Sequence, residues 1–114
     1  VGQGGATIAP SSLGIYTVRE DSIPGWADSL LVPAMIKGRL YRQKLSADGR
    51  LAVGDPFELF RTTNRYRDLA LNPNGRTIYI ATDNAGRTTG RNGEMTDKLE
   101  HPGAIIQYTY DDQP

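Results

Sequence analysis

The stretch RTTNRYRDLALNPNGRTIYIATDNAG, residues 61–86, decides the fold of this chain. Apolar residues recur at alternate positions on both sides of its centre, namely Leu69, Leu71, Ile78 and Ile80. This is the spacing of half-buried strands. Between them lies Asn72 to Gly75, where proline presets φ and asparagine and glycine accept the positive φ of a tight turn. The stretch therefore predicts two antiparallel strands joined by one short turn.

Charged residues mark the open end of this hairpin, away from the turn. Arg65 and Arg67 are two residues apart, so on an extended strand both guanidinium groups leave the same face. Asp83 ends the returning strand, close to where the first strand begins. Two same-side arginines and a carboxylate predict an anion-binding corner. A surface ion-pair cluster is the other interpretation of the same three residues.

The composition favours one domain and excludes some functions. A chain of 114 residues can bury a core of its own. With 13 basic and 13 acidic residues, the net charge of zero argues against nucleic-acid or membrane binding through bulk charge. The chain has no cysteine, which is as compatible with a periplasmic or secreted protein as with a cytosolic one. No apolar run approaches membrane-spanning length, and the start has neither Met nor a signal peptide, so we expect a mature, truncated or excised chain.

The rest of the chain predicts further strands and no helix. Candidate strands are residues 13–17, 29–36, 39–45, 55–60 and 104–110, and residues 87–99 read as a loop. Pro33 marks a bulge or a strand end in the apolar run 29–36. Alternation in 55–60 places Phe60 on the face opposite Leu59. We expect an all-β fold of antiparallel four-stranded propeller blades, about one and a half to two of them, with 1–60 as one blade and 61–114 as most of the next. A small sandwich is the alternative.

The chemical inventory contains no complete active site. His101 precedes a proline, and a turn residue is the favoured interpretation over a general base. No carboxylate cluster with ligand spacing and no nucleophile motif occurs, so we expect neither a self-contained metal site nor a catalytic residue on this chain. Trp26, Tyr41 and Phe60 are expected to serve packing rather than a carbohydrate platform. The residues alone thus predict an all-β module with a cationic corner.

Several short motifs resemble those of a known family. They are Ala9 to Ser12, Gly25 with Trp26, Leu30 to Pro33, Gly38 with Arg42, Asn64 to Asp68, Asn72 to Gly75, Thr82 with Asp83 and Gly86, and Leu99 to Gly103. Nearly the whole chain resembles the C-terminal part of the soluble quinoprotein glucose/sorbosone dehydrogenases. The resemblance implies a six-bladed β-propeller with pyrroloquinoline quinone (PQQ) and calcium on its top face. It also implies oxidation of an aldose at C1 to the lactone.

The same resemblance assigns roles to individual residues. Arg65 and Arg67 match two arginines that hold the cofactor, and guanidinium forks suit its three carboxylates. Asp83 matches an acid that orients those arginines, and Thr7 matches a threonine at the cofactor rim. Lys37 stands one residue after the place of a cofactor-contacting lysine, and one residue on a strand means the opposite face unless a bulge restores it.

Two positions depart from the family pattern, and several functions stay open. Ile36 stands at the family's lysine position and Gly5 at its stacking tryptophan, which points to another cofactor geometry or to a non-catalytic propeller. The histidine base and the calcium ligands are expected outside this chain, which we expect to be inactive alone, and the whole protein to be periplasmic or secreted. The expected partners are a sugar substrate and the remaining blades or a second copy, with neither nucleic acid nor membrane. The alternatives are a non-catalytic binding or structural propeller, or an inactive fragment.

Overall fold

The computed structural model describes residues 9–17 and 22–111, which form nine strands. The strands are β1 (Gly14–Tyr16), β2 (Ser29–Pro33), β3 (Gly38–Lys44), β4 (Phe57–Thr62), β5 (Tyr66–Leu71), β6 (Thr77–Thr82), β7 (Thr88–Thr89), β8 (Met95–Thr96) and β9 (Ile105–Thr109). No helix occurs in these residues, and thus none that could cross a membrane. The all-β prediction is confirmed for the described part of the chain.

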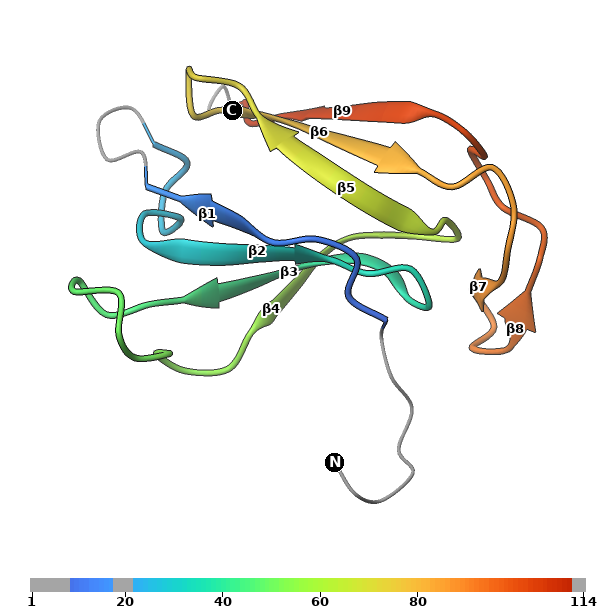
Figure 1. Ribbon diagram of the computed structural model, residues 1–114, viewed down its shortest axis with the longest axis horizontal. Coiled ribbons are helices and arrows are strands. Elements are labelled where there is room, and N and C mark those ends of the chain that lie inside the picture. Colours follow the sequence, from blue (N-terminus) through green and yellow to red (C-terminus); the bar gives the residue numbers. More distant parts are fainter. Residues whose placement is uncertain (1–8, 18–21, 112–114) are drawn as a thin grey trace.

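The strands form two antiparallel sheets and a short ribbon (Figure 1). The first sheet has the order β1-β2-β3-β4, so each strand pairs with the next one in sequence. The second sheet has the order β5-β6-β9, and the β7–β8 ribbon is inserted between its last two strands. The two sheets face each other, with the ribbon at one end. This arrangement is consistent with part of a propeller, and the number of blades stays a prediction.

The hairpin of β5 and β6 forms as its sequence predicts. Leu69 pairs with Ile80 and Leu71 with Ile78, so the alternating apolar residues share the face toward the first sheet. In the turn, the N–H of Gly75 donates to the carbonyl of Asn72 at 2.9 Å. Of the four turn residues, Gly75 alone has a positive φ, of 73°. The side-chain oxygen of Asn74 accepts from the backbone N–H groups of Arg76 and Thr77, which fixes the chain between the turn and β6.

The core lies between the two sheets. Its buried members are Tyr16, Ile23, Trp26, Leu31, Leu40, Tyr66, Ile78 and Ile80. Trp26 meets Tyr16 edge to face at 5.7 Å between ring centroids, and Phe60 stacks on Tyr108 at 3.9 Å. Trp26 and Phe60 therefore pack as expected, and the stack of Phe60 on Tyr108 joins β4 of the first sheet to β9 of the second. Tyr41 lies on the other face of β3, where its hydroxyl donates to Glu58.

A bulge in β4 overturns one detail of the expected alternation. The pairing of β3 with β4 shifts register between Gly38 and Leu40, and Phe60 has a φ of 53°. This left-handed backbone is uncommon for an aromatic residue and turns its side chain inward. Leu59 and Phe60 consequently both pack against the core, so the prediction that they occupy opposite faces was wrong.

Two segments between the strands also differ from expectation. The apolar run 29–36 is a strand only as far as Pro33, where β2 ends, and residues 34–37 connect β2 to β3. Proline lacks an N–H for further pairing, so its role as a strand end is confirmed. Residues 87–99 were predicted to be a loop, yet they contain the β7–β8 ribbon. Strands of two residues are too short to show an alternating pattern.

Gly38 gives the fold a position where no side chain fits. A Cβ built there would meet the backbone carbonyl oxygens of Asn64 and Thr62, the latter at 2.6 Å. We expect Gly38→Ala to lower the free energy of unfolding by about 1–3 kcal/mol, because backbone cannot give way as a flexible side chain can. Urea denaturation measures this.

The matched control is Gly14→Ala, whose added Cβ would meet a flexible Leu69 methyl group at 3.0 Å. That substitution should cost clearly less than Gly38→Ala. Equal losses of stability would contradict the packing described here.

Candidate functional site

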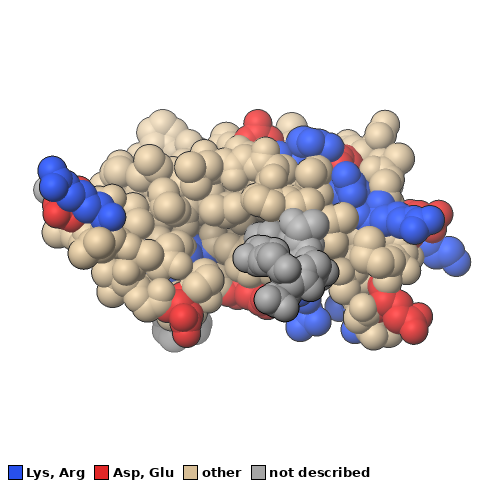
Figure 2. Space-filling view, turned by 60° about the horizontal axis from the view of Figure 1, so that its bottom comes forward, with Lys and Arg blue, Asp and Glu red and all other residues tan. Residues whose placement is uncertain are grey.

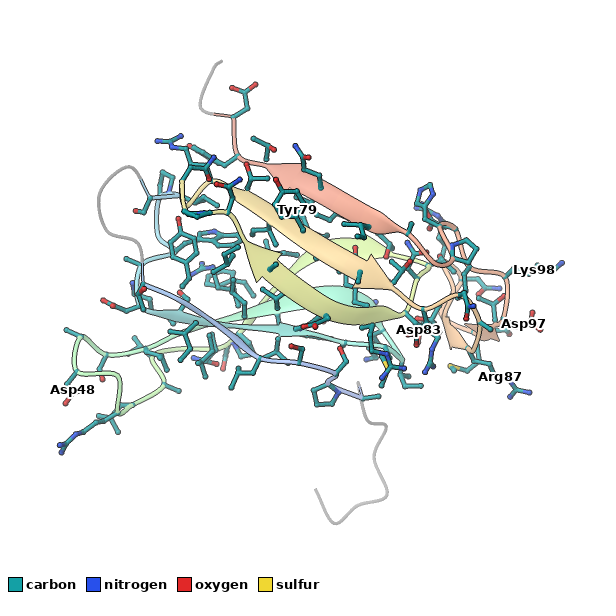
Figure 3. All side chains as sticks on the ribbon, turned by 45° about the horizontal axis from the view of Figure 1, so that its top comes forward. Asp48, Tyr79, Asp83, Arg87, Asp97 and Lys98 are labelled. Atoms are coloured by element: carbon teal, nitrogen blue, oxygen red, sulfur yellow. The ribbon has the colours of Figure 1, made fainter. Side chains whose placement is uncertain are left out.

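Arg65, Arg67 and Asp83 meet at the open end of the β5–β6 hairpin, and we name these three residues the arginine corner. Arg65 Nε donates to Asp83 Oδ2 at 2.8 Å, and Arg67 Nε donates to Asp83 Oδ1 at 2.7 Å. Arg67 Nη2 adds a bond of 2.9 Å to Oδ2. Figure 3 shows Asp83 where the hairpin ends, toward the β7–β8 ribbon. One carboxylate thus holds two guanidinium groups.

A bulge in β5 brings the two arginines together. Tyr66 pairs with Thr82 and Asp68 with Ala81, so Arg67 has no residue opposite it. Arg65 lies just before β5, and its carbonyl accepts from the N–H of Asp83 at 3.0 Å. The two guanidinium groups converge as predicted. Strict alternation is not the cause, because the bulge redirects the Arg67 side chain.

Arg65 is fixed on several sides. Its Nη1 donates to the carbonyl of Arg87 at 2.8 Å, and its Nη2 lies 3.5 Å from the sulfur of Met35. Gly86 has a φ of 117°, and a Cβ there would meet Arg65 Nε at 2.6 Å. Glycine is therefore required both by the backbone conformation and by the guanidinium packed on it.

Arg67 is the accessible member of the pair. Its side chain is 52% exposed, whereas that of Arg65 is 18% exposed. Arg67 Nη1 makes no hydrogen bond to any described residue. The arginine corner carries two positive charges and one negative charge, so it keeps a net positive charge and donors for a further anion.

The chemistry open to Asp83 is limited by its neighbours. The hydrogen bond from Arg67 is the largest cause that lowers the pKa of this carboxyl, and Arg65 adds to it against the opposing effect of burial. Asp83 is therefore ionised at neutral pH, and it cannot act as a general acid there. Its function is to position the two guanidinium groups.

Of the remaining predicted residues, the structure describes only Lys37. Lys37 is half-buried in the connection 34–37, so the alternation argument for its direction does not apply. Its ammonium group has no hydrogen bond or ion pair to a described residue. Thr7 and Gly5 lie outside the described residues. Ala9, the first described residue, accepts through its carbonyl from the N–H of Met35 at 3.1 Å, and the sulfur of Met35 lies against Arg65.

Sequence reasoning missed the part played by Asn64. This residue is fully buried, and its Oδ1 accepts from the N–H of His101 at 2.7 Å. Its Nδ2 is buried with no hydrogen-bond partner among the described residues. The side chain of His101 is exposed, in keeping with a turn residue. Across residues 9–17 and 22–111 no group of three or more metal-binding side chains occurs.

Comparison with known proteins identifies the family. Residues 3–91 match the sequence profile of the family described as Glucose / Sorbosone dehydrogenase. The chain belongs to the glucose/sorbosone dehydrogenase family. Quinoprotein glucose dehydrogenase B of Acinetobacter calcoaceticus is 38% identical to it over 104 residues, which are 91% of this chain and 22% of that relative. The family resemblance of the short motifs is confirmed, and this family member spans less than a quarter of the length of its relative.

The shared carboxylate predicts how the arginine corner responds to pH. Because the pKa of Asp83 is lowered in the folded state, the corner stabilises the fold above the unfolded carboxyl pKa of about 4. That stability is lost as the pH falls through the folded-state pKa. We expect Arg67→Gln to raise the folded-state pKa of Asp83, so that the stability lost in acid is smaller and its loss is complete at a higher pH. Titration of the Asp83 carboxyl carbon by NMR measures the shift.

The control is Arg87→Gln, because the arginine corner uses only the backbone carbonyl of Arg87, whose side chain is exposed. It should leave the titration of Asp83 unchanged. An unchanged pKa in Arg67→Gln would contradict the pairing.

Proposed function

We propose that this chain is the C-terminal portion of a PQQ-dependent aldose dehydrogenase and that the arginine corner binds the cofactor. The observation that carries the proposal is the convergence of Arg65 and Arg67 on Asp83 at one exposed end of the hairpin. Membership of the glucose/sorbosone dehydrogenase family supports it, as does similarity to a relative named as a quinoprotein glucose dehydrogenase.

The donors of the arginine corner fit the chemistry of PQQ, which is a planar tricarboxylate. The side chain of Arg67 is 52% exposed and its Nη1 donors are free to bond a carboxylate that approaches from solvent. Arg65 is held by hydrogen bonds to Asp83 and to the carbonyl of Arg87, so it contributes positive charge and a fixed surface beside the cofactor. In this proposal Lys37 and Thr7 complete the cofactor rim, and calcium is bound by residues outside this chain.

The chain's own residues bind and orient, and they transfer no proton. When bound, PQQ supplies the quinone that accepts the two electrons of sugar oxidation at C1. Guanidinium groups stay protonated at physiological pH and donate hydrogen bonds without releasing a proton. Asp83 stays ionised between them. The base that takes the sugar's hydroxyl proton therefore belongs, in this proposal, to another part of the propeller.

The exposed outer faces of the two sheets fit a place among further blades. Ile15 in the first sheet is 55% exposed and Ile105 in the second is 75% exposed. Large exposed apolar side chains on the face of a sheet suit contact with other protein surface. We propose that they pack against the remaining blades, or against a second copy when those blades are missing, in a periplasmic or secreted protein.

The cofactor proposal is tested in a polypeptide that carries the whole propeller. Arg67→Ala should weaken PQQ binding about 10- to 100-fold, since a charge-assisted hydrogen bond contributes about 1.5–3 kcal/mol. Arg65→Ala should weaken it too, with an added loss of stability. Arg87→Ala is the control and should bind PQQ like the unaltered protein. Titration of the cofactor-free protein with PQQ measures the affinity.

Two outcomes would contradict the proposal. Unchanged affinity in both Arg65→Ala and Arg67→Ala would remove the arginine corner as the cofactor site. Failure of the unaltered protein to bind PQQ or to oxidise any aldose would favour a non-catalytic propeller.

The outer faces predict self-association of the isolated chain. Light scattering should show dimers or larger species, and Ile105→Lys should reduce them, because a charge would then replace the exposed apolar side chain at the start of β9. Leu51→Lys is the control, since Leu51 is 67% exposed in the connection between β3 and β4. A monodisperse monomer of the unaltered chain would contradict the assignment of these faces.

A further inference from the structure

A second cationic site lies beside the β7–β8 ribbon, apart from the arginine corner. A cleft of about 310 Å³ is lined by Arg39, Arg61, Thr62, Thr63, Thr89, Gly90 and Arg91, and we name it the ribbon cleft. Its lining contains three arginines and no carboxylate. Figure 2 shows basic side chains, with acidic ones among them, gathered at the end of the molecule that carries the ribbon in Figure 1.

The walls of the ribbon cleft are fixed by contacts between segments far apart in sequence. The N–H and the hydroxyl of Thr89 both donate to the carbonyl of Ile36, at 2.7 and 2.9 Å. Glu100 accepts from the N–H of Thr63 at 2.9 Å and from Arg91 at 3.1 Å. The first two bonds hold the ribbon against the connection between β2 and β3, and Glu100 links the residues after β7 to the residue that follows β4. The walls of the cleft are therefore fixed by hydrogen bonds.

The three guanidinium groups keep N–H donors that are not bonded to their carboxylate partners. Arg39 has a side chain only 10% exposed, and both of its bonds to Glu58 come from Nη1, which leaves Nε and Nη2 uncommitted to that carboxylate. The guanidinium of Arg61 makes no hydrogen bond or ion pair to a described residue. Three positive charges thus face two carboxylates, Glu58 and Glu100, that lie outside the lining.

We propose that the ribbon cleft binds a phosphate group, either as inorganic phosphate or as a phosphate monoester. Guanidinium groups from three different segments offer donors from three directions, which suits a tetrahedral dianion better than a flat carboxylate. The segment around Gly90 also borders an adjoining hollow of about 450 Å³, whose lining includes Asn92, Thr96 and Lys98 together with Glu94 and Met95. That hollow gives room for the alcohol part of a monoester.

Titration with inorganic phosphate, at constant ionic strength and followed by amide NMR shifts, tests the proposal in the protein. We expect saturable shifts at residues 61–63 and 89–91. Arg61→Gln should weaken binding about tenfold, because it removes a charge-assisted donor without leaving a carboxylate unpaired. Arg91→Gln, at a side chain that is 80% exposed, should also weaken it.

The matched control is Arg50→Gln, an exposed arginine beside Asp48 in the connection between β3 and β4 at the opposite end of the molecule (Figure 3). It removes the same charge and should leave the affinity unchanged. Tighter binding of glycerol phosphate than of inorganic phosphate would identify a monoester, and equal or weaker binding would identify the free ion. Equal weakening in all three variants, shifts elsewhere in the chain, or equal affinity for malonate would overturn the proposal. The amide shifts and the phosphate affinities do not depend on PQQ. The phosphate proposal can therefore fail or succeed independently of the proposed dehydrogenase function.

Discussion

The shared carboxylate of Asp83 is the interaction on which one whole end of the second sheet depends. Two guanidinium groups that bond the same carboxylate lie close enough to repel each other. The Arg65 side chain is only 18% exposed, so water cannot fully compensate its charge. Asp83 accepts from both, while its own N–H bonds the carbonyl of Arg65. The start of β5, the end of β6 and the segment through Gly86 are thereby joined around one anion. Removing that anion would leave two unpaired cations rather than a stronger cationic site.

Regular strands build the core, and irregular residues build the sites. The paired apolar residues of β5 and β6 bury the face between the sheets, yet the accessible arginine comes from a bulge in β5. A second bulge at Phe60, with its left-handed backbone, turns an aromatic ring onto Tyr108 and precedes Arg61 of the ribbon cleft. Local departures from the ladder are a common way to aim side chains at a functional surface.

Sequence periodicity predicted the strands of the two sheets and the hairpin turn, because burial of one face imposes alternation that can be read directly. It could not predict the bulges, since two consecutive apolar residues such as Leu59 and Phe60 also occur on regular strands with apolar residues on both faces. Arg65 and Arg67 were identified as a pair by spacing and by family resemblance. The contacts of Arg65 with Met35 and with the carbonyl of Arg87 were not, because they depend on how distant segments pack. The ribbon cleft was missed for the same reason, as its arginines are spread over β3, β4 and residues after β7.

Hydrogen exchange at the arginine side chains tests the shared carboxylate most directly. The Nε–H groups of Arg65 and Arg67 both donate to Asp83, so they should exchange with solvent far more slowly than that of Arg50. Asp83→Asn should abolish most of this protection at Arg67, whose Nε and Nη2 both bond that side chain. An Arg67 Nε–H that exchanges as fast as that of Arg50 in the unaltered protein would contradict the account.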